Sequence, residues 1–139
     1  MKTLAAHDVN VGDALPVIDI PITATLIIGG AIASRDYQDV HHDRELARQR
    51  GAKDIFMNIL TTNGLVGRFV TDWAGPEATL KAVKIRLGAP NYPGDTMRLT
   101  GAVTEKSGHE VTVELQGTNA IGEHVKGTVT LTLPEGAGR

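Results

Sequence analysis

Cysteine is absent from the 139 residues, aromatic side chains make up only 4% of them, and neither sign of charge dominates. Without cysteine, the chain has no disulfides, no thiolate catalysis and no zinc site built on cysteine. Fourteen basic and sixteen acidic residues give a formal charge of −2, so the basic surface that attracts nucleic acid or an anionic membrane is not expected. With so few aromatics, Val, Ile and Leu must fill the core of a single domain spanning residues 1–139.

Long hydrophobic runs are also missing. The longest one, Leu26 to Ala33, is too short to cross a bilayer, and the first residues lack the apolar region of a secretory signal. We therefore expect a cytoplasmic protein without a membrane segment. Glycine-rich phosphate loops and the His-Glu-x-x-His metal motif do not occur either, so no cofactor and no metal are expected.

Three helices are predicted from capping and apolar periodicity. Thr23 can cap a short helix over 24–33, and Asp43 can cap a second one over 44–50 that ends in basic residues and a glycine. Between Ile55 and Trp73 the apolar residues lie on several faces of a helical wheel, which is typical of a buried helix. Other parts of the chain must cover it.

Strict alternation of apolar and polar residues predicts strands in the second half of the chain. Four runs show it, separated by glycine-containing turns: 83–87, 99–103, 111–116 and 125–133. The first 22 residues contain two prolines, Pro16 and Pro21, and are expected to form an arm or an edge strand. The sequence therefore favours an α+β fold in which a curved antiparallel sheet packs around one long helix.

The densest cluster of ionisable groups is the run 34–43, between the two short helices. Asp36 and His41 are five residues apart, a spacing that lets a loop turn both side chains toward one water molecule. In the alternative interpretation, Asp36 caps a turn and His41 is a buried, hydrogen-bonded side chain. A metal held by His41, His42 and Asp43 is disfavoured, because adjacent residues point in different directions.

The start of the long helix is a second candidate. Backbone N–H groups in a first helical turn lack partners and can stabilise an oxyanion, and Asn58 lies in this stretch. In the alternative interpretation, Asn58, Thr61 and Thr62 only satisfy local backbone groups. His124 lies in a polar stretch and is expected to be solvated, as are His7 and His109.

The run 34–41, with the sequence SRDYQDVH, resembles the hydratase motif of MaoC-like (R)-specific enoyl-CoA hydratases. The resemblance implies a single hot-dog domain, an antiparallel sheet wrapped around a long central helix. It also implies that Asp36 and His41 are catalytic and hold the attacking water, with Asn58 at the oxyanion or substrate-binding position. Arg35 stands where the family usually has glycine, and Met57-Asn58 replaces its His-Gly pair.

Three runs, 35–43, 53–56 and 70–76, resemble the small MaoC-like subunits of bacterial steroid (cholesterol) side-chain enoyl-CoA hydratases. This resemblance implies a steroid acyl-CoA substrate that is hydrated to a 3-hydroxyacyl-CoA. It also implies a heterodimer or heterotetramer with a larger MaoC-like subunit, and we expect that partner to carry a fused domain that docks a thiolase-like aldolase.

Two other functions stay open. Dehydration of a general (R)-3-hydroxyacyl thioester is the same chemistry run backwards. The chain can also be a non-catalytic scaffold whose partner holds the active site, although the presence of both Asp36 and His41 argues against this. A thioesterase is disfavoured because 55–70 contains no acidic residue.

Overall fold

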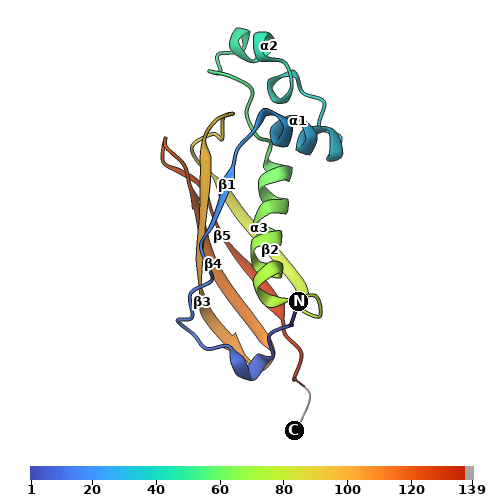
Figure 1. The fold of residues 1–139 in the computed structure, drawn as a ribbon, viewed down its shortest axis with the longest axis vertical. Helices are drawn as coiled ribbons and strands as arrows, with labels where there is room; N and C mark the ends of the chain where they lie inside the picture. The colour runs from blue at the N-terminus through green and yellow to red at the C-terminus, as the bar shows by residue number, and fades with distance from the viewer. Residues whose placement is uncertain (137–139) are drawn as a thin grey trace.

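The computed structural model describes residues 1–136, in which a five-stranded antiparallel sheet packs along one face against a long helix, α3 (Figure 1). The strand order is β1-β3-β4-β5-β2, with bounds β1 Ile18–Pro21, β2 Thr79–Leu87, β3 Thr96–Ser107, β4 Glu110–Thr118 and β5 Glu123–Thr132. The helices are α1 Ala24–Ala33, α2 Arg44–Gln49 and α3 Ile59–Ala74, and two short 3-10 turns are η1 Ala6–Asp8 and η2 Asp39–His41. None of these helices, within residues 1–136, has the length and apolarity that a membrane span requires.

The predicted strands form because their alternation gives the sheet one apolar face. In β4 the side chains of Val111, Val113 and Leu115 are buried against the helix layer, while Glu114 and Gln116 are exposed. Prolines restrict β1 to the edge, where it pairs only with β3. The expected α+β arrangement and the edge position of β1 are confirmed. The expected meander holds only for β3, β4 and β5, because β2 pairs with β5 at the opposite edge instead of with β3.

The long helix begins later than the sequence predicted. The apolar run starts at Ile55, but α3 begins at Ile59, and the chain before it is not helical. Ile55 and Met57 are nevertheless fully buried there. The prediction was wrong because a non-helical segment can also bury apolar side chains against the core, so an apolar run alone does not determine where a helix starts.

Only part of α3 is covered by the sheet. Val66, Phe69 and Val70 are buried in the core, whereas Leu60 and Arg68 are exposed on the opposite side. The prediction of a helix enclosed all round is therefore too strong for this chain by itself.

Helices α1 and α2 lie together at one end of the molecule, beside the N-terminus of α3 (Figure 1). Thr23 caps α1 by accepting a hydrogen bond from the Leu26 N–H at 3.0 Å, as predicted. Near its other end α1 crosses the first turn of α3 at Gly30, where a Cβ atom would collide with Thr61 Oγ1. The glycine lets the two helices approach closely, and the loop that leaves α1 carries the candidate site.

Candidate active site

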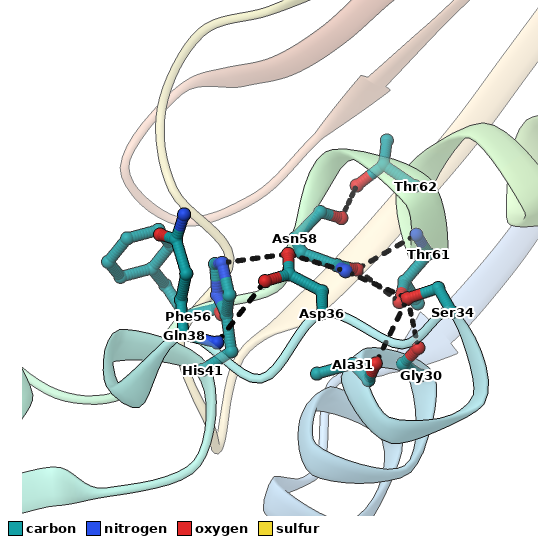
Figure 2. Close-up of polar contacts among 10 residues, drawn as sticks. All are labelled: Gly30, Ala31, Ser34, Asp36, Gln38, His41, Phe56, Asn58, Thr61 and Thr62. Atoms are coloured by element: carbon teal, nitrogen blue, oxygen red, sulfur yellow. Dashed lines mark hydrogen bonds and ion pairs between the residues drawn. The ribbon is translucent and has the colours of Figure 1, made fainter.

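Asp36 and His41 lie close together, as their spacing predicted (Figure 2). Asp36 Oδ2 is 3.4 Å from His41 Nε2. The His41 side chain is 8% exposed and that of Asp36 is 23% exposed, so the pair is mostly enclosed while the carboxylate keeps access from outside. Both groups come from the short segment between α1 and α2.

The backbone at the end of α1 fixes the position of Asp36. Its N–H donates to Ala31 O at 2.9 Å and the Arg35 N–H donates to Ile32 O at 3.0 Å, which is a Schellman helix ending. This motif requires a left-handed residue, and Arg35 has a φ of 57°. The family's usual glycine at this position is consistent with the same conformation.

Phe56 positions His41. His41 Nδ1 lies 2.6 Å from Phe56 O, and because a carbonyl oxygen only accepts, Nδ1 carries the hydrogen. The Phe56 N–H in turn donates to Val40 O at 3.1 Å, which ties the histidine loop to the segment before α3. In neutral His41 the lone pair of Nε2 therefore faces Asp36. Two acceptors cannot bond directly, so the contact needs either a proton on Nε2 or a water molecule that donates to both atoms from one side.

The Asp36 carboxylate is stabilised in its charged form. Its pKa is lowered chiefly by the hydrogen bond from the Asn58 side chain, with smaller contributions from the Gln38 N–H and the charge of His41, while partial burial opposes the shift. Asp36 is consequently ionised at neutral pH and can accept a proton or a hydrogen bond. Its Oδ1 accepts from the Gln38 N–H at 3.3 Å, so the turn-capping role considered from the sequence is also present.

Asn58 is brought into the same cluster through its side chain. Asn58 Nδ2 donates to Asp36 Oδ2 at 3.1 Å and to Ser34 Oγ at 3.0 Å, while Oδ1 accepts from the Thr61 N–H at 3.0 Å and caps α3. Only 2% of the residue is exposed. The sequence predicted a role for its backbone N–H, which stays a prediction, but did not identify the side-chain contact. Ser34 was missed because no local pattern connects residues 24 positions apart.

His124 does not belong to the cluster and is not solvated, so that prediction was wrong. It is 1% exposed, with Nδ1 2.6 Å from Ala89 O and Nε2 2.9 Å from Thr62 Oγ1. Burial lowers its pKa. In the register of β4 and β5, Gly117 pairs with Val125 and Thr118 with Glu123, leaving His124 as an extra bulged residue. The bulge breaks the period-two pattern on which its predicted exposure depended.

The neighbouring charged residues have structural partners. Asp43 caps α2 by accepting from the Leu46 N–H at 3.0 Å, as predicted. Arg50 pairs with Asp39 at 2.7 Å and Arg44 with Asp54 at 3.1 Å. In residues 1–136 no three His, Asp or Glu side chains are placed to hold a metal ion.

Known proteins share this arrangement of sheet and helix. Residues 10–125 match the MaoC like domain family. The chain belongs to that family. It is 49% identical over 123 residues to the 3-oxo-4,17-pregnadiene-20-carboxyl-CoA hydratase beta subunit of Mycobacterium tuberculosis, and the match covers 88% of this chain and 95% of that protein.

Solved structures of related proteins have the same fold. A chain of the ChsH1-ChsH2 complex from M. tuberculosis superposes with a TM-score of 0.88 at 48% identity, covering 89% of this chain and 98% of that chain. The unliganded R-hydratase PhaJ1 from Pseudomonas aeruginosa gives a TM-score of 0.88 at 20% identity, covering 96% and 88% of the two chains. At that identity the second similarity shows the fold alone, and it confirms the expected hot-dog fold.

Proposed function

We propose that this MaoC-like chain is a subunit of an enoyl-CoA hydratase that adds water across the conjugated double bond of a steroid side-chain acyl-CoA. The observation that carries the proposal is the pair of acceptor atoms, Asp36 Oδ2 and His41 Nε2, that face each other at 3.4 Å. The 49% identical relative, named as a pregnadiene carboxyl-CoA hydratase subunit, supports the substrate class.

The two acceptors suit one water molecule. A water placed against them donates one hydrogen to Asp36 Oδ2 and the other to His41 Nε2, which leaves an oxygen lone pair for attack on the β-carbon. As the C–O bond forms, the dyad takes one proton from the water. The α-carbon receives a proton in return, so the elements of one water molecule are added to the double bond. No step in this sequence requires a cofactor.

Negative charge develops on the thioester oxygen during attack and needs a donor. We assign this role to the backbone at Asn58, where α3 begins, because N–H groups at a helix start lack intrahelical partners and carry the positive end of the dipole. The Asn58 side chain turns toward Asp36 and Ser34, as Figure 2 shows.

We further propose that a larger MaoC-like subunit completes the enzyme as a heterodimer or heterotetramer. The relative in the ChsH1-ChsH2 complex and the relative named as a beta subunit both support a partner of this kind. Half-exposed apolar side chains that directly follow Asn58, Ile59 and Leu60 at the start of α3, also support it. A fused domain on the partner that docks a thiolase-like aldolase remains part of this proposal.

The test follows the loss of conjugated enoyl-thioester absorbance on a steroid enoyl-CoA and on a short linear enoyl-CoA, with the chain alone and with its co-expressed larger partner. We expect steroid turnover only with both chains. Equal turnover of the linear substrate by the chain alone would instead indicate a general hydratase.

Variants of the dyad test the site. Asp36→Asn and His41→Ala are each expected to lower kcat by about 100-fold or more, the usual size of a general acid–base contribution. Asp39→Asn is the matched control, because Asp39 lies in the same loop but pairs with Arg50 on the surface. Full activity in Asp36→Asn would reject the dyad and favour the scaffold function.

A further inference from the structure

The Asn58 side chain uses all of its hydrogen-bonding capacity. Its two N–H bonds donate to Asp36 Oδ2 and Ser34 Oγ, and its oxygen accepts from both the N–H and the hydroxyl of Thr61, at 3.0 and 2.6 Å. The orientation of the amide is unambiguous, because a carboxylate can only accept and a backbone N–H can only donate. Such a fully satisfied buried amide is a rigid connection between the groups it touches.

We propose that the Asn58 side chain is a positioning residue that orients the Asp36 carboxylate toward His41 and the attacking water. The inference rests on the proposed hydratase function and adds a residue to it. Asn58 does so without touching substrate, since the amide acts entirely through Asp36. This role is separate from that of the Asn58 backbone N–H.

The contacts of Asp36 show what the amide holds in place. Oδ1 accepts from the Gln38 N–H at 3.3 Å, and Oδ2 accepts from Asn58 while facing His41. The backbone of Asp36 is fixed by the end of α1, but the carboxyl group can rotate about its terminal bond. The Asn58 contact restrains that rotation from the side opposite Gln38, and it keeps Oδ2 next to His41 Nε2.

Ser34 strengthens the restraint. Its hydroxyl donates to Gly30 O at 2.7 Å and accepts from Asn58 Nδ2, so the amide is connected to the last turn of α1 as well as to α3. Gly30 allows the two helices to come close enough for this contact. The position of the carboxylate is thereby set by both helices together.

The requirement for asparagine follows from its two tasks. Asn, Asp and Ser are comparably good helix N-caps, because each offers an oxygen to the first-turn N–H groups. Of these three, only asparagine caps α3 and also donates N–H bonds to a carboxylate. Aspartate would place a second negative charge against Asp36, and serine is too short to reach Oδ2. The substitutions Asn58→Asp and Asn58→Ser therefore keep the cap and remove the donor.

The experiment measures kcat, KM and their pH dependence for these two variants in the complex with the larger subunit, together with thermal unfolding. We expect kcat to fall by about 10–100-fold, the size of effect that a small misplacement of a catalytic group produces, with a smaller change in KM. The acidic limb of the kcat profile should move to higher pH, furthest in Asn58→Asp. Thr23→Ala, which removes the cap of α1 away from the dyad, is the control and should leave the limb in place.

A second measurement needs no turnover. The carboxyl carbon of Asp36, assigned with Asp36→Asn, is titrated by NMR in the wild-type chain and in both variants, and its pKa should rise in both. Unchanged Asp36 titration and an unchanged acidic limb in both variants would overturn the positioning role. If Asp36→Asn itself keeps full activity, the dyad fails and this inference fails with it, whereas an inactive Asp36→Asn beside wild-type-like Asn58 variants rejects the positioning role alone.

Discussion

At the scale of single residues, the least expected feature is the backbone of Arg35. Its φ of 57° lies in the left-handed region, which costs a residue with a Cβ roughly 1–2 kcal/mol relative to glycine. The conformation is retained because the Schellman ending of α1 requires it. The same helix ending places Asp36 next to His41, so the strained backbone of Arg35 and the geometry of the site have the same origin.

Substitutions at Arg35 test this conformation. Arg35→Gly removes the steric cost of the left-handed conformation but raises the conformational entropy of the unfolded chain. We therefore expect a free energy of unfolding within about 1 kcal/mol of wild type. Arg35→Val should lose about 1–2 kcal/mol, because a β-branched side chain tolerates the left-handed region poorly. Urea unfolding of both variants provides the measurement. The side chain is exposed, so lost packing contributes little, and equal stability of the Gly and Val variants would contradict the assigned backbone conformation.

At the scale of elements, the crossing of α1 and α3 depends on one of two adjacent glycines. A methyl group at Gly30 would collide with the Thr61 side chain, while a methyl group at Gly29 meets nothing within 4 Å. Gly29→Ala should stabilise the protein by about 0.5–1 kcal/mol through helix propensity alone. Gly30→Ala should destabilise it by about 1–3 kcal/mol through overpacking and should also lower kcat, since Ser34 and Asp36 directly follow α1.

The two glycine variants serve as each other's control. They are measured by urea unfolding and by the enoyl-CoA assay side by side. Loss of activity in Gly29→Ala, or wild-type activity and stability in Gly30→Ala, would show that the close crossing does not position the site.

The elements also show how far sequence reasoning reaches. Strands β2 to β5 follow from alternation, and the caps Thr23 and Asp43 follow from residue type, because each depends on neighbours along the chain. The closeness of Asp36 and His41 was predicted from their spacing of five residues, and their catalytic role, implied by the resemblance to the hydratase motif, stays a prediction. The Asn58–Ser34 contact could not be predicted from the sequence, because it depends on the crossing of two helices. The burial of His124 could not be predicted either, because it depends on a bulge in the register of β4 and β5.

At the scale of the whole molecule, the site lies at one end of an elongated core. The dyad lies at the end where α1 and α2 extend beside the start of α3, while most of the apolar core lies between the sheet and α3 and reaches this end through Ile27 and Ala47 (Figure 1). Exposed apolar side chains from three segments, Ile32, Tyr37 and Leu60, lie on α1, on the dyad loop and on the first turn of α3. A partner seated on this end would cover these exposed apolar side chains together with the site.

A buried titratable group, His124, makes the free energy of unfolding of the whole fold depend on pH. His124 is buried and neutral, with Nδ1–H donating to Ala89 O and Nε2 accepting from the Thr62 hydroxyl. Its pKa in the folded protein is lowered by burial, below the value of about 6.5 expected in the unfolded chain. As the pH falls below about 6.5, the unfolded state therefore binds a proton before the folded state does. Stability should fall with a slope of up to about 1.4 kcal/mol per pH unit until the folded pKa is reached.

The lowered pKa of Asp36 has an effect of the same sign in a separate pH range, below about pH 4, because its carboxylate must be protonated there.

The substitution His124→Asn removes the pH dependence of stability that begins below about pH 6.5 and leaves that of Asp36 in place. We expect a variant that is less stable at pH 8, because Thr62 loses its acceptor, but whose free energy of unfolding varies less between pH 6.5 and 5. The measurement is urea unfolding at half-unit pH steps, with NMR titration of the His124 ring as a direct check. An equal slope in the two proteins would contradict a neutral buried histidine, since the same ring must release its proton before the chain can fold around it.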